Sequence, residues 1–425
     1  MNIVVFEDAG VRKLFPITTG RPAYAISCGS FRLIDWLHEF DGNMVGLVRP
    51  YIETIQLNDY PEFLDQLNSG LQWTLVVNAR VAPSVDNLRR LQRLMGETNS
   101  DIKADQSIVV QSNSAIAAAI VPTSKFGSDK TTWQKTIEDL ANEPNNKASE
   151  NGLVLFDYPH DVIAENMKCC EANLEHRIGM GRYKQHSPGV YLGENVQISQ
   201  HVVFDSKPGP ILIDDNVKIG PFCFLRGPIY VGPNSKISEH AAIKDFVSIG
   251  HTCKIGGEIE GTILESYSNK QHHGFLGHSY LGSWINLGAG TCNSDLKNTY
   301  GIVNMQYGYG DEFEKVPTGM QFVGCIIGDY AKTAINTSIF TGKLIGTGSM
   351  VYGFATTNVP SFVNYARTFD KVGDLPPEII VTTQKRMFSR RNVTQRPCDI
   401  QLVHDMYRVT DSERPDGLSR EPLSL

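Results

Sequence analysis

The sequence lacks the features that mark several classes of protein. No apolar run is long enough to cross a bilayer, and the N-terminal one ends at Glu7 and Asp8 after four residues. It has no block of basic residues, and its net charge of −7 opposes nonspecific binding to nucleic acid. Its eight cysteines show no CxxC spacing of the kind that binds zinc. We therefore expect a cytoplasmic globular protein with no membrane and no nucleic-acid partner.

What the sequence has is a repeat of period six. Branched aliphatic residues recur at this spacing without a slip, at Ile213, Ile219, Leu225, Val231, Ile237, Ile243, Ile249 and Ile255. A period of six fits neither an amphipathic helix nor a half-buried strand over this length. It is typical of a parallel β-helix, in which short strands turn corners and successive coils stack. Burial of each aliphatic side chain contributes about 1.5–3 kcal/mol.

The repeat also bounds the domains. We expect a β-helix over residues 186–358, with about six coils of three hexapeptides each. Cys223 and Cys253 fall at inward positions and are predicted to be small buried side chains. Residues 359–425 lose the period and are predicted to form a helical tail.

Residues 1–185 show a different pattern. Apolar runs at 2–6, 44–48, 73–77, 107–111 and 115–121 alternate with helical spacing at 29–39, 86–96 and 130–143. This alternation predicts a Rossmann-like α/β domain with a mainly parallel sheet, followed by a helix at about 162–177. Ligands of such sheets bind at the carboxyl ends of strands, so the loops at 7–22 and 78–84 are the first candidates.

Polar segments interrupt the repeat, and insertions in a repeat array often carry function. Three of the eleven histidines, His272, His273 and His278, fall within seven residues of one interruption. Histidine is easily tuned to accept a proton near neutral pH. Metal binding by these three histidines has no supporting spacing or carboxylate partner.

Here the sequence resembles a known family. Hexapeptide repeats after an α/β domain, with a histidine upstream of Asn286-Leu-Gly-Ala-Gly-Thr291, resemble the bifunctional GlmU-type enzymes. These join an acetyltransferase acting on glucosamine 1-phosphate to a uridylyltransferase acting on N-acetylglucosamine 1-phosphate. The resemblance is closest to a divergent bacterial branch of sugar nucleotidyltransferases, through segments such as Phe275-Leu-Gly-His-Ser279, Ser294-Asp-Leu-Lys-Asn298 and Ile327-Gly-Asp-Tyr-Ala-Lys-Thr333.

The resemblance implies roles for individual residues. The family's catalytic histidine falls on His272, fourteen residues before Asn286, where it would take a proton from the sugar amine that attacks acetyl-CoA. His273 is the competing base, and His278 is expected to hydrogen-bond within the loop. Asn286 and Asn293 match sugar-contacting positions, although Phe275 and Ser294 replace two family tyrosines. Lys270 and Lys297 are candidates for binding the sugar phosphate on charge and proximity in sequence rather than on a motif match.

The resemblance also implies a left-handed β-helix and a homotrimer. Acetyl-CoA would lie between the coils of neighbouring subunits, with Lys332, Thr333 and Ala334 in the wall of its site.

The nucleotidyltransferase motifs of the family are altered in this chain. Arg12 and Pro16-Ile-Thr18 stand where the family has Thr-Arg and Pro-Leu-Thr, but the glycine-rich loop is absent. Ala23 replaces the lysine after Pro22, which leaves Arg21 as the nearest cation. Arg80 stands where the family has its magnesium-binding aspartate. Arg12, Arg21 and Arg80 are therefore candidates for phosphate binding.

Asp8 and Asp161 remain as candidate ligands if the domain is active and uses Mg²⁺. The altered motifs leave three alternatives for this domain. It is an altered nucleotidyltransferase that uses UTP, a nucleotidyltransferase with another substrate, or a degenerate domain that only supports the trimer.

The sequence supports three hypotheses about function. The first is a transferase of amino-sugar nucleotide synthesis that uses sugar phosphate, acetyl-CoA and UTP. The second is a sugar-1-phosphate nucleotidyltransferase whose β-helix only scaffolds the oligomer. The third is a noncatalytic solenoid that binds a partner.

Overall fold

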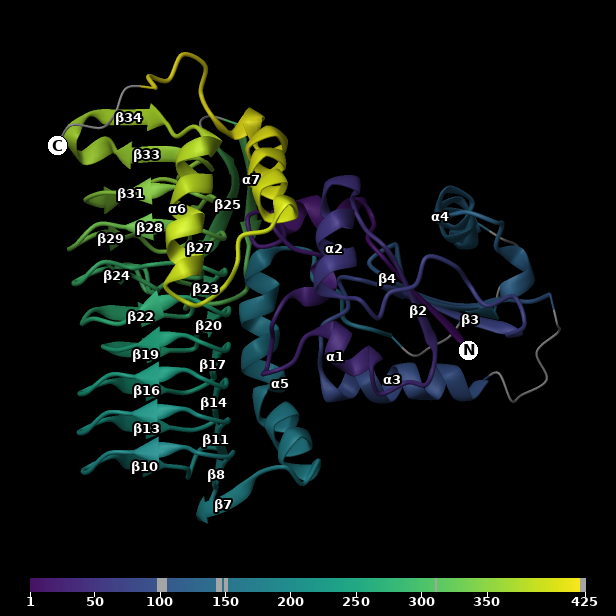
Figure 1. Ribbon diagram of the computed structural model, residues 1–425, viewed down its shortest axis with the longest axis horizontal. Coiled ribbons are helices and arrows are strands. Elements are labelled where there is room, and N and C mark those ends of the chain that lie inside the picture. Colours follow the sequence, from purple (N-terminus) through teal and green to yellow (C-terminus); the bar gives the residue numbers. More distant parts are fainter. Residues whose placement is uncertain (98–104, 143–146, 149–151, 310–311, 421–425) are drawn as a thin grey trace. The chain divides into compact units, whose positions relative to one another are not determined.

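The computed structural model describes residues 1–97, 105–142, 147–148, 152–309 and 312–420. The chain divides into two compact units, drawn in Figure 1. Unit 1 comprises residues 1–14, 21–26 and 31–157, and unit 2 comprises residues 15–20, 27–30 and 158–425. The division after Asp157 differs from the predicted boundary at 185, because the helix that follows Asp157 is compact with the coils. No helix within the described ranges is long and apolar enough to cross a membrane.

Unit 1 is built on a six-stranded sheet of order β2-β1-β3-β5-β4-β6. The strands are β1 (Asn2–Phe6), β2 (Asn43–Leu47), β3 (Trp73–Asn78), β4 (Ile108–Ser112), β5 (Ala115–Pro122) and β6 (Lys147–Ala148). β1 pairs in parallel with β2 and β3, as expected, but β5 runs antiparallel to β3 and β4. The reversal arises at Asn113 and Ser114, whose φ angles of 49° and 65° close a tight hairpin. The sheet is therefore mixed.

The helices of unit 1 are α1 (Leu33–Leu37), α2 (Glu53–Asp59), α3 (Val85–Gly96) and α4 (Lys130–Asp139). α3 begins where the Ser84 side chain accepts a hydrogen bond from the Asn87 N–H, and it buries Leu88, Leu91 and Leu94. α1 is shorter than the predicted helix over 29–39, because Ser30 has a φ of 75° and precedes the helix in a turn.

Unit 2 is a parallel β-helix, and its strands form ladders along the stack (Figure 1). The longest ladder contains β7 (Lys184–Ser187), β8 (Val190–Leu192), β11 (Ile211–Ile213), β14 (Ile229–Val231), β17 (Val247–Ile249), β20 (Ile263–Leu264), β23 (Tyr280–Leu281), β27 (Cys325–Ile327) and β30 (Lys343–Ile345). All but β7 run parallel, one strand a coil. The described coils thus exceed the six predicted, because coils with insertions break the period of six.

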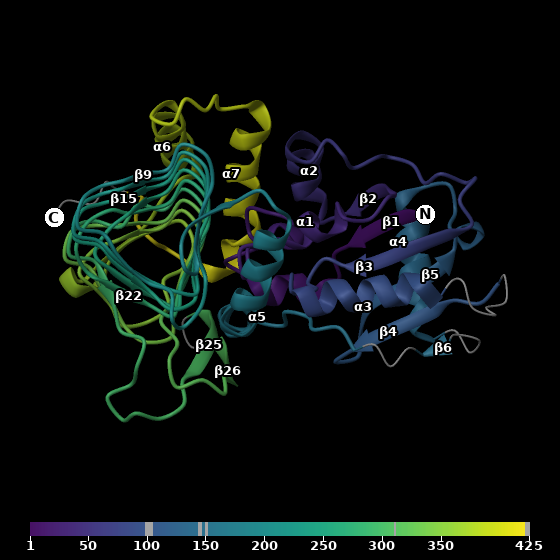
Figure 2. The same cartoon turned by 90° about the horizontal axis from the view of Figure 1, so that it is seen from below.

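The other faces of the coils carry shorter ladders. One face holds β10 (Val203–Asp205), β13 (Phe224–Arg226), β16 (Ala242–Lys244), β19 (Glu258–Glu260), β22 (Phe275–Gly277), β24 (Cys292–Asn293), β29 (Ser338–Ile339) and β32 (Phe354–Ala355). Another holds β9 (Gln197–Ile198), β12 (Lys218–Ile219), β15 (Lys236–Ile237), β18 (Lys254–Ile255), β21 (Asn269–Lys270), β28 (Lys332–Thr333), β31 (Met350–Val351), β33 (Val363–Ala366) and β34 (Lys371–Asp374). Seen end-on, the coils superimpose around a common core (Figure 2).

The period-six aliphatics form that core. All eight of them are at most 2% exposed, and Ile219, Ile237 and Ile255 stack in register on successive coils. Cys223 and Cys253 are buried among them as free thiols, which confirms the prediction for these two residues. Corner residues such as Asn216 and Asn234 have φ near 58°, a conformation that asparagine tolerates better than most residues.

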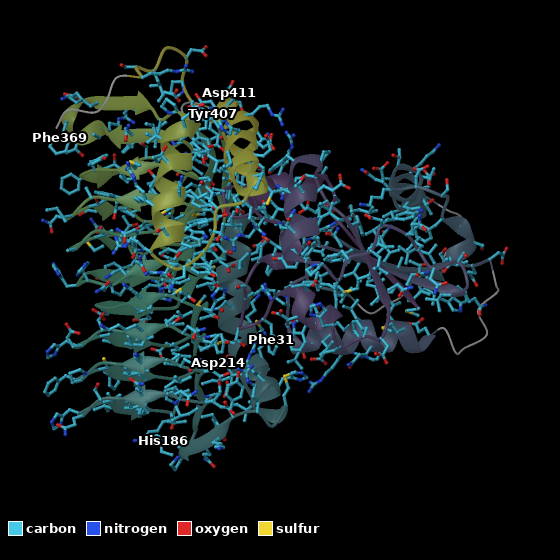
Figure 3. All side chains as sticks on the ribbon, in the orientation of Figure 1. Phe31, His186, Asp214, Phe369, Tyr407 and Asp411 are labelled. Carbon is cyan, nitrogen blue, oxygen red and sulfur yellow. The ribbon has the colours of Figure 1, made fainter. Side chains whose placement is uncertain are left out.

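Further elements of unit 2 lie outside the coils. Helix α5 (Pro159–Gly179) packs Cys170 and Leu174 against Leu212 and Tyr230 of the coils. The hairpin of β25 (Asn304–Tyr309) and β26 (Glu312–Pro317) projects from one interruption. α6 (Pro377–Ser389) and α7 (Pro397–Val409) follow the last coils. Figure 3 labels Tyr407 of α7, whose hydroxyl donates to the Asp374 carboxylate at 2.9 Å.

Candidate functional site

The first candidate site lies at the carboxyl ends of β1, β2 and β3 in unit 1. Glu7 follows β1, and its side chain is 1% exposed. It accepts hydrogen bonds from the Arg49 Nε at 2.8 Å, the Arg49 N–H at 2.9 Å and the Ala23 N–H at 2.9 Å. A buried carboxylate needs such partners because its charge is poorly solvated. Glu7 thus ties the loop at 21–26 to the end of β2.

A second carboxylate–arginine pair lies beside it on the chain. The Arg80 guanidinium donates to both oxygens of Asp8, from Nε at 2.8 Å and from Nη2 at 2.7 Å. Its Nη1 donates to Asp157 at 2.8 Å and to the Phe156 carbonyl at 2.7 Å. Burial alone would raise the pKa of Asp8, but the hydrogen bonds and charge of Arg80 hold that pKa below its usual value. The two predicted loops therefore meet at one ion pair.

Two more arginines, Arg21 and Arg12, belong to the surroundings of the Glu7–Arg49 pair. Arg49 Nη2 donates to the Arg21 carbonyl at 2.8 Å, and its Nη1 donates to the Tyr51 hydroxyl at 3.0 Å. Burial raises the pKa of Tyr51 to about 12, against the opposing charges of Arg49 and Arg12. Arg12 itself is exposed. Sequence reasoning missed Arg49, although its place directly after a buried strand is the same signal that pointed to Arg80.

The three predicted phosphate-binding arginines thus differ in accessibility. Arg12 is exposed and Arg21 half-buried, whereas Arg80 is 3% exposed and engaged with carboxylates. Phosphate binding is open to Arg12 and Arg21, and the donors of Arg80 are already committed.

The carboxylates do not fit a magnesium site. Asp8 is bound by Arg80 and by the Asn78 amide at 2.9 Å. Asp161 caps helix α5, where it accepts a hydrogen bond from the Tyr158 N–H at 2.8 Å, and it belongs to unit 2. Across the described ranges, no three His, Cys, Asp or Glu side chains are grouped to hold a metal ion. The residues present therefore give Mg²⁺ no ready set of ligands.

The second candidate site lies in unit 2, where the repeat is interrupted after β21. His272 and His273 are exposed. Lys270 precedes them, in register with Ile255 of the coil before, and it points into the core with 1% exposure. Its Nζ donates to the carbonyls of His272 at 2.6 Å and Gly256 at 3.2 Å. Burial lowers the pKa of Lys270 to about 8.

The predicted sugar-contacting residues are held in different ways. Asn286 is exposed, and its Oδ1 accepts a weak hydrogen bond from Asn269 at 3.4 Å. Asn293 is 5% exposed, because its amide bonds both the N–H and the carbonyl of Gly277. Lys297 is half-buried and donates to the Ile302 carbonyl at 2.6 Å. Of the predicted set, only Asn286 and the two histidines present free polar surface.

A histidine–carboxylate pair adjoins this region. His278 Nδ1 lies 2.8 Å from Asp295 Oδ2, and the two side chains are 13% and 12% exposed. The ring stacks on Phe322 at 5.2 Å. A carboxylate at Nδ1 favours the tautomer whose Nε2 accepts a proton. His278 was predicted to hydrogen-bond within its own loop, but its partner Asp295 lies seventeen residues along the chain, in the next interruption.

The predicted acetyl-CoA wall lies on β28 and the corner that follows it. Lys332 is half-buried, its Nζ donates to the Tyr330 carbonyl at 2.9 Å, and burial lowers its pKa to about 8. Thr333 is buried and its hydroxyl lies 2.7 Å from that of Thr291. The Ala334 carbonyl accepts from the hydroxyls of Thr291 and Thr337. Only Lys332 offers a charged group here.

Part of the chain is similar to a family of known proteins. Residues 3–177 match the model of the sugar nucleotidyl transferase family. The matched segment contains both carboxylate–arginine pairs.

Several proteins similar to this chain are named bifunctional protein GlmU. The protein of Acaryochloris marina is 29% identical over 182 residues, which cover 42% of this chain and 30% of the relative. That of Thermotoga maritima is 31% identical over 173 residues, which cover 40% of this chain and 29% of the relative. These matches confirm the resemblance to a divergent GlmU-like family. The chain spans about 30% of the length of the curated relatives it matches.

Solved structures of acyltransferases are also similar to parts of the chain. UDP-N-acetylglucosamine acyltransferase from Campylobacter jejuni is 11% identical, covers 50% of this chain and 94% of its own, and gives a TM-score of 0.23. The acetyltransferase domain of PglB from Neisseria gonorrhoeae is 9% identical, covers 85% and 94%, and gives a TM-score of 0.19. At these scores the likeness supports no conclusion about this chain.

Proposed function

We propose that the chain is a transferase of sugar phosphates, with a nucleotide- or phosphate-binding edge in unit 1 and an acyl-transfer site in unit 2. The observation that carries the proposal is the family match over residues 3–177, within which the ends of β1, β2 and β3 gather Arg12, Arg21 and Arg49. Arg12 is exposed and Arg21 is half-buried, and arginine side chains at strand ends suit a phosphate ligand because the guanidinium fork matches its oxygens.

The acyl-transfer part rests on the second site. In this proposal the amine of glucosamine 1-phosphate attacks the thioester carbon of acetyl-CoA, and CoA leaves as the C–S bond breaks. His272 takes the proton that the amine loses, and Asn286 contacts the sugar. His273 and Lys297 lie near enough in sequence to contribute, and Lys332 neutralises a phosphate of CoA. The exposure of His272 and His273 supports their access to a substrate.

Besides His273, His278 is a further candidate base, because Asp295 already orients its ring. General-base catalysis contributes about 10²–10⁴-fold, so loss of the base is measurable. The decisive assay follows CoA release from acetyl-CoA and glucosamine 1-phosphate in wild type, His272→Ala and His278→Ala. His240→Ala, at an exposed corner of another coil, is the matched control. Unchanged CoA release in His272→Ala would contradict the assignment of His272 as the base. Loss in His278→Ala and in Asp295→Asn moves the base to that pair.

The nucleotidyl part is tested separately with UTP, N-acetylglucosamine 1-phosphate and detection of pyrophosphate. Arg12→Ala is expected to weaken turnover, with Arg89→Ala on the exposed face of α3 as its control. Pyrophosphate release without acetyl transfer selects a nucleotidyltransferase whose β-helix is a scaffold. No turnover with either pair of substrates favours a noncatalytic solenoid.

A homotrimer in the cytoplasm completes the proposal. The face that begins with β10 and ends with β32 carries two large exposed apolar side chains on neighbouring coils, Phe340 and Phe354, at 48% and 51% exposure. Such side chains favour burial against another copy. Sedimentation of wild type and Phe354→Asp checks this assignment, and a monomeric wild type contradicts it.

A further inference from the structure

The guanidinium of Arg80 is the central cation of the strand-end edge in unit 1. Four of its N–H donations are made to oxygens of three residues, Asp8, Phe156 and Asp157, at 2.7–2.8 Å. Two carboxylates and a carbonyl converging on one centre form the kind of oxygen set that a hard divalent cation takes. Here a side chain of the protein itself fills that centre.

The surrounding chain is shaped to this guanidinium. Asn78, the last residue of β3, donates from its amide to Asp8 at 2.9 Å and accepts the Arg80 N–H at 3.0 Å. Gly10 lies against the guanidinium, and a Cβ added there would meet Arg80 Cζ at 2.7 Å. The Gly10 N–H also donates to Asp8 at 3.0 Å. The loop after β1 and the end of β3 therefore close on the Arg80 side chain rather than on an open cavity.

The charges of this cluster fix which cation can stay. Asp8 and Asp157 bring two negative charges and Arg80 returns one positive charge. Burial opposes the charged guanidinium, but its bonds and charge interactions with Asp8 and Asp157 raise the pKa of Arg80 above its usual value. Arginine therefore stays charged at any pH at which the protein is folded. A metal ion could enter only by breaking the bidentate ion pair between Asp8 and the buried Arg80 guanidinium.

We propose that Arg80 is a built-in substitute for a divalent metal at this edge, so that Asp8 and Asp157 do not bind Mg²⁺ in the wild-type protein. The inference deepens the proposed function, since it names the cation of the same strand-end site. It predicts that removal of the guanidinium uncovers a cation site, because the two carboxylates then lose their counter-charge. A gain of metal binding on loss of one arginine is an outcome that a merely structural ion pair at a surface would not give.

The test is a Mn²⁺ titration of the full chain, with free Mn²⁺ followed by electron paramagnetic resonance. Wild type is expected to leave the Mn²⁺ signal unchanged, and Arg80→Ala is expected to bind a single Mn²⁺ per chain. Adding Asp8→Asn to Arg80→Ala should abolish that binding. Asp86→Asn in the Arg80→Ala background is the matched control, because Asp86 is exposed at the start of α3 and should leave binding intact.

Wild-type Mn²⁺ binding that Asp8→Asn removes would overturn the proposal, as would an Arg80→Ala protein that folds and binds no Mn²⁺. If Arg80→Ala has no cooperative thermal transition, Arg80→Met replaces it. Methionine removes the positive charge but fills much of the space of the arginine side chain, so Mn²⁺ should then raise the melting temperature of the variant and not that of wild type. No such rise in a folded Arg80→Met protein counts against the proposal. The result stands apart from the proposed function, whose failure would appear as absent turnover in the substrate assays.

Discussion

Lys270 gives the sharpest quantitative prediction. This side chain lies inside the β-helix at 1% exposure, in register with Ile255, and no acidic partner is among the atoms that its Nζ bonds. Replacing it with methionine keeps much of its length and removes its charge. The Lys270→Met variant should therefore differ from wild type in the pH dependence of its stability.

The size of the difference follows from the shifted pKa. Burial lowers the pKa of Lys270 from 10.5 to about 8. Below pH 8 the lysine is charged in both the folded and the unfolded chain, and the cost of burying that charge is fully present. Between pH 8 and 10.5 the unfolded chain binds more protons, so the stability of wild type rises with pH. The rise relative to pH 7 is about 1.4 kcal/mol at pH 9 and about 2.5 kcal/mol at pH 10.

The assay compares urea unfolding of wild type and Lys270→Met at pH 7, 9 and 10. Methionine leaves the carbonyls of Gly256 and His272 without this donor, which costs about 1 kcal/mol each at every pH. That cost lowers the free energy of unfolding of Lys270→Met by the same amount at every pH. It therefore does not change how the difference between the two proteins varies with pH. Lys332, whose pKa is also lowered to about 8, is common to both proteins and cancels. Ile255→Met is the control, since it keeps Lys270 and alters only apolar packing.

The result that would refute the reasoning is a constant separation between wild type and Lys270→Met from pH 7 to 10. A separation that grows in Ile255→Met as well would assign the effect to another group. If the difference in unfolding free energy from wild type grows with pH for Lys270→Met alone, the destabilisation comes from the buried charge of Lys270.

The remaining predictions concern packing. Ile243→Ala should lower the free energy of unfolding by about 2–5 kcal/mol because it empties space in the core, whereas Ile335→Ala, at 69% exposure, should change it by less than about 0.5 kcal/mol in the same urea assay. Gly277→Ala should also destabilise unit 2, since its new Cβ would lie 2.2 Å from Asp295 Oδ2 and displace that carboxylate. Gly96→Ala, with nothing within 4 Å, should instead raise the thermal midpoint, and a fall there would contradict the helix assignment at the end of α3.

The coils were predictable from the sequence because their order is local. Each inward aliphatic follows the last by six residues, and Ile219, Ile237 and Ile255 stack as that spacing requires. Insertions hide the period, so the number of coils was underestimated. The β4–β5 reversal was missed because Asn113 and Ser114 gave no strong turn signal such as Asn-Gly.

The sites were less predictable, because their contacts join distant parts of the chain. Arg80 lies 72 residues from Asp8 and 77 from Asp157, and no spacing rule relates such positions. The strand-end rule pointed to the loops at 7–22 and 78–84, but not to the pairing of Asp8 with Arg80. Lys270 was predicted to bind a sugar phosphate from its charge, and only the coil register shows that its side chain points inward.

The division of the chain into units affects the order in which its parts can fold during synthesis. Residues 15–20 and 27–30 are made among the first but belong to unit 2. Ser27 donates to Glu265, 238 residues later, and a Cβ on Gly20 would touch Asp329. A ribosome adding about 5–20 residues per second exposes these early segments for many seconds before their partners emerge. Protection of the nascent chain should therefore appear last at 15–20 and 27–30, well after the surrounding strands β1 and β2 have paired.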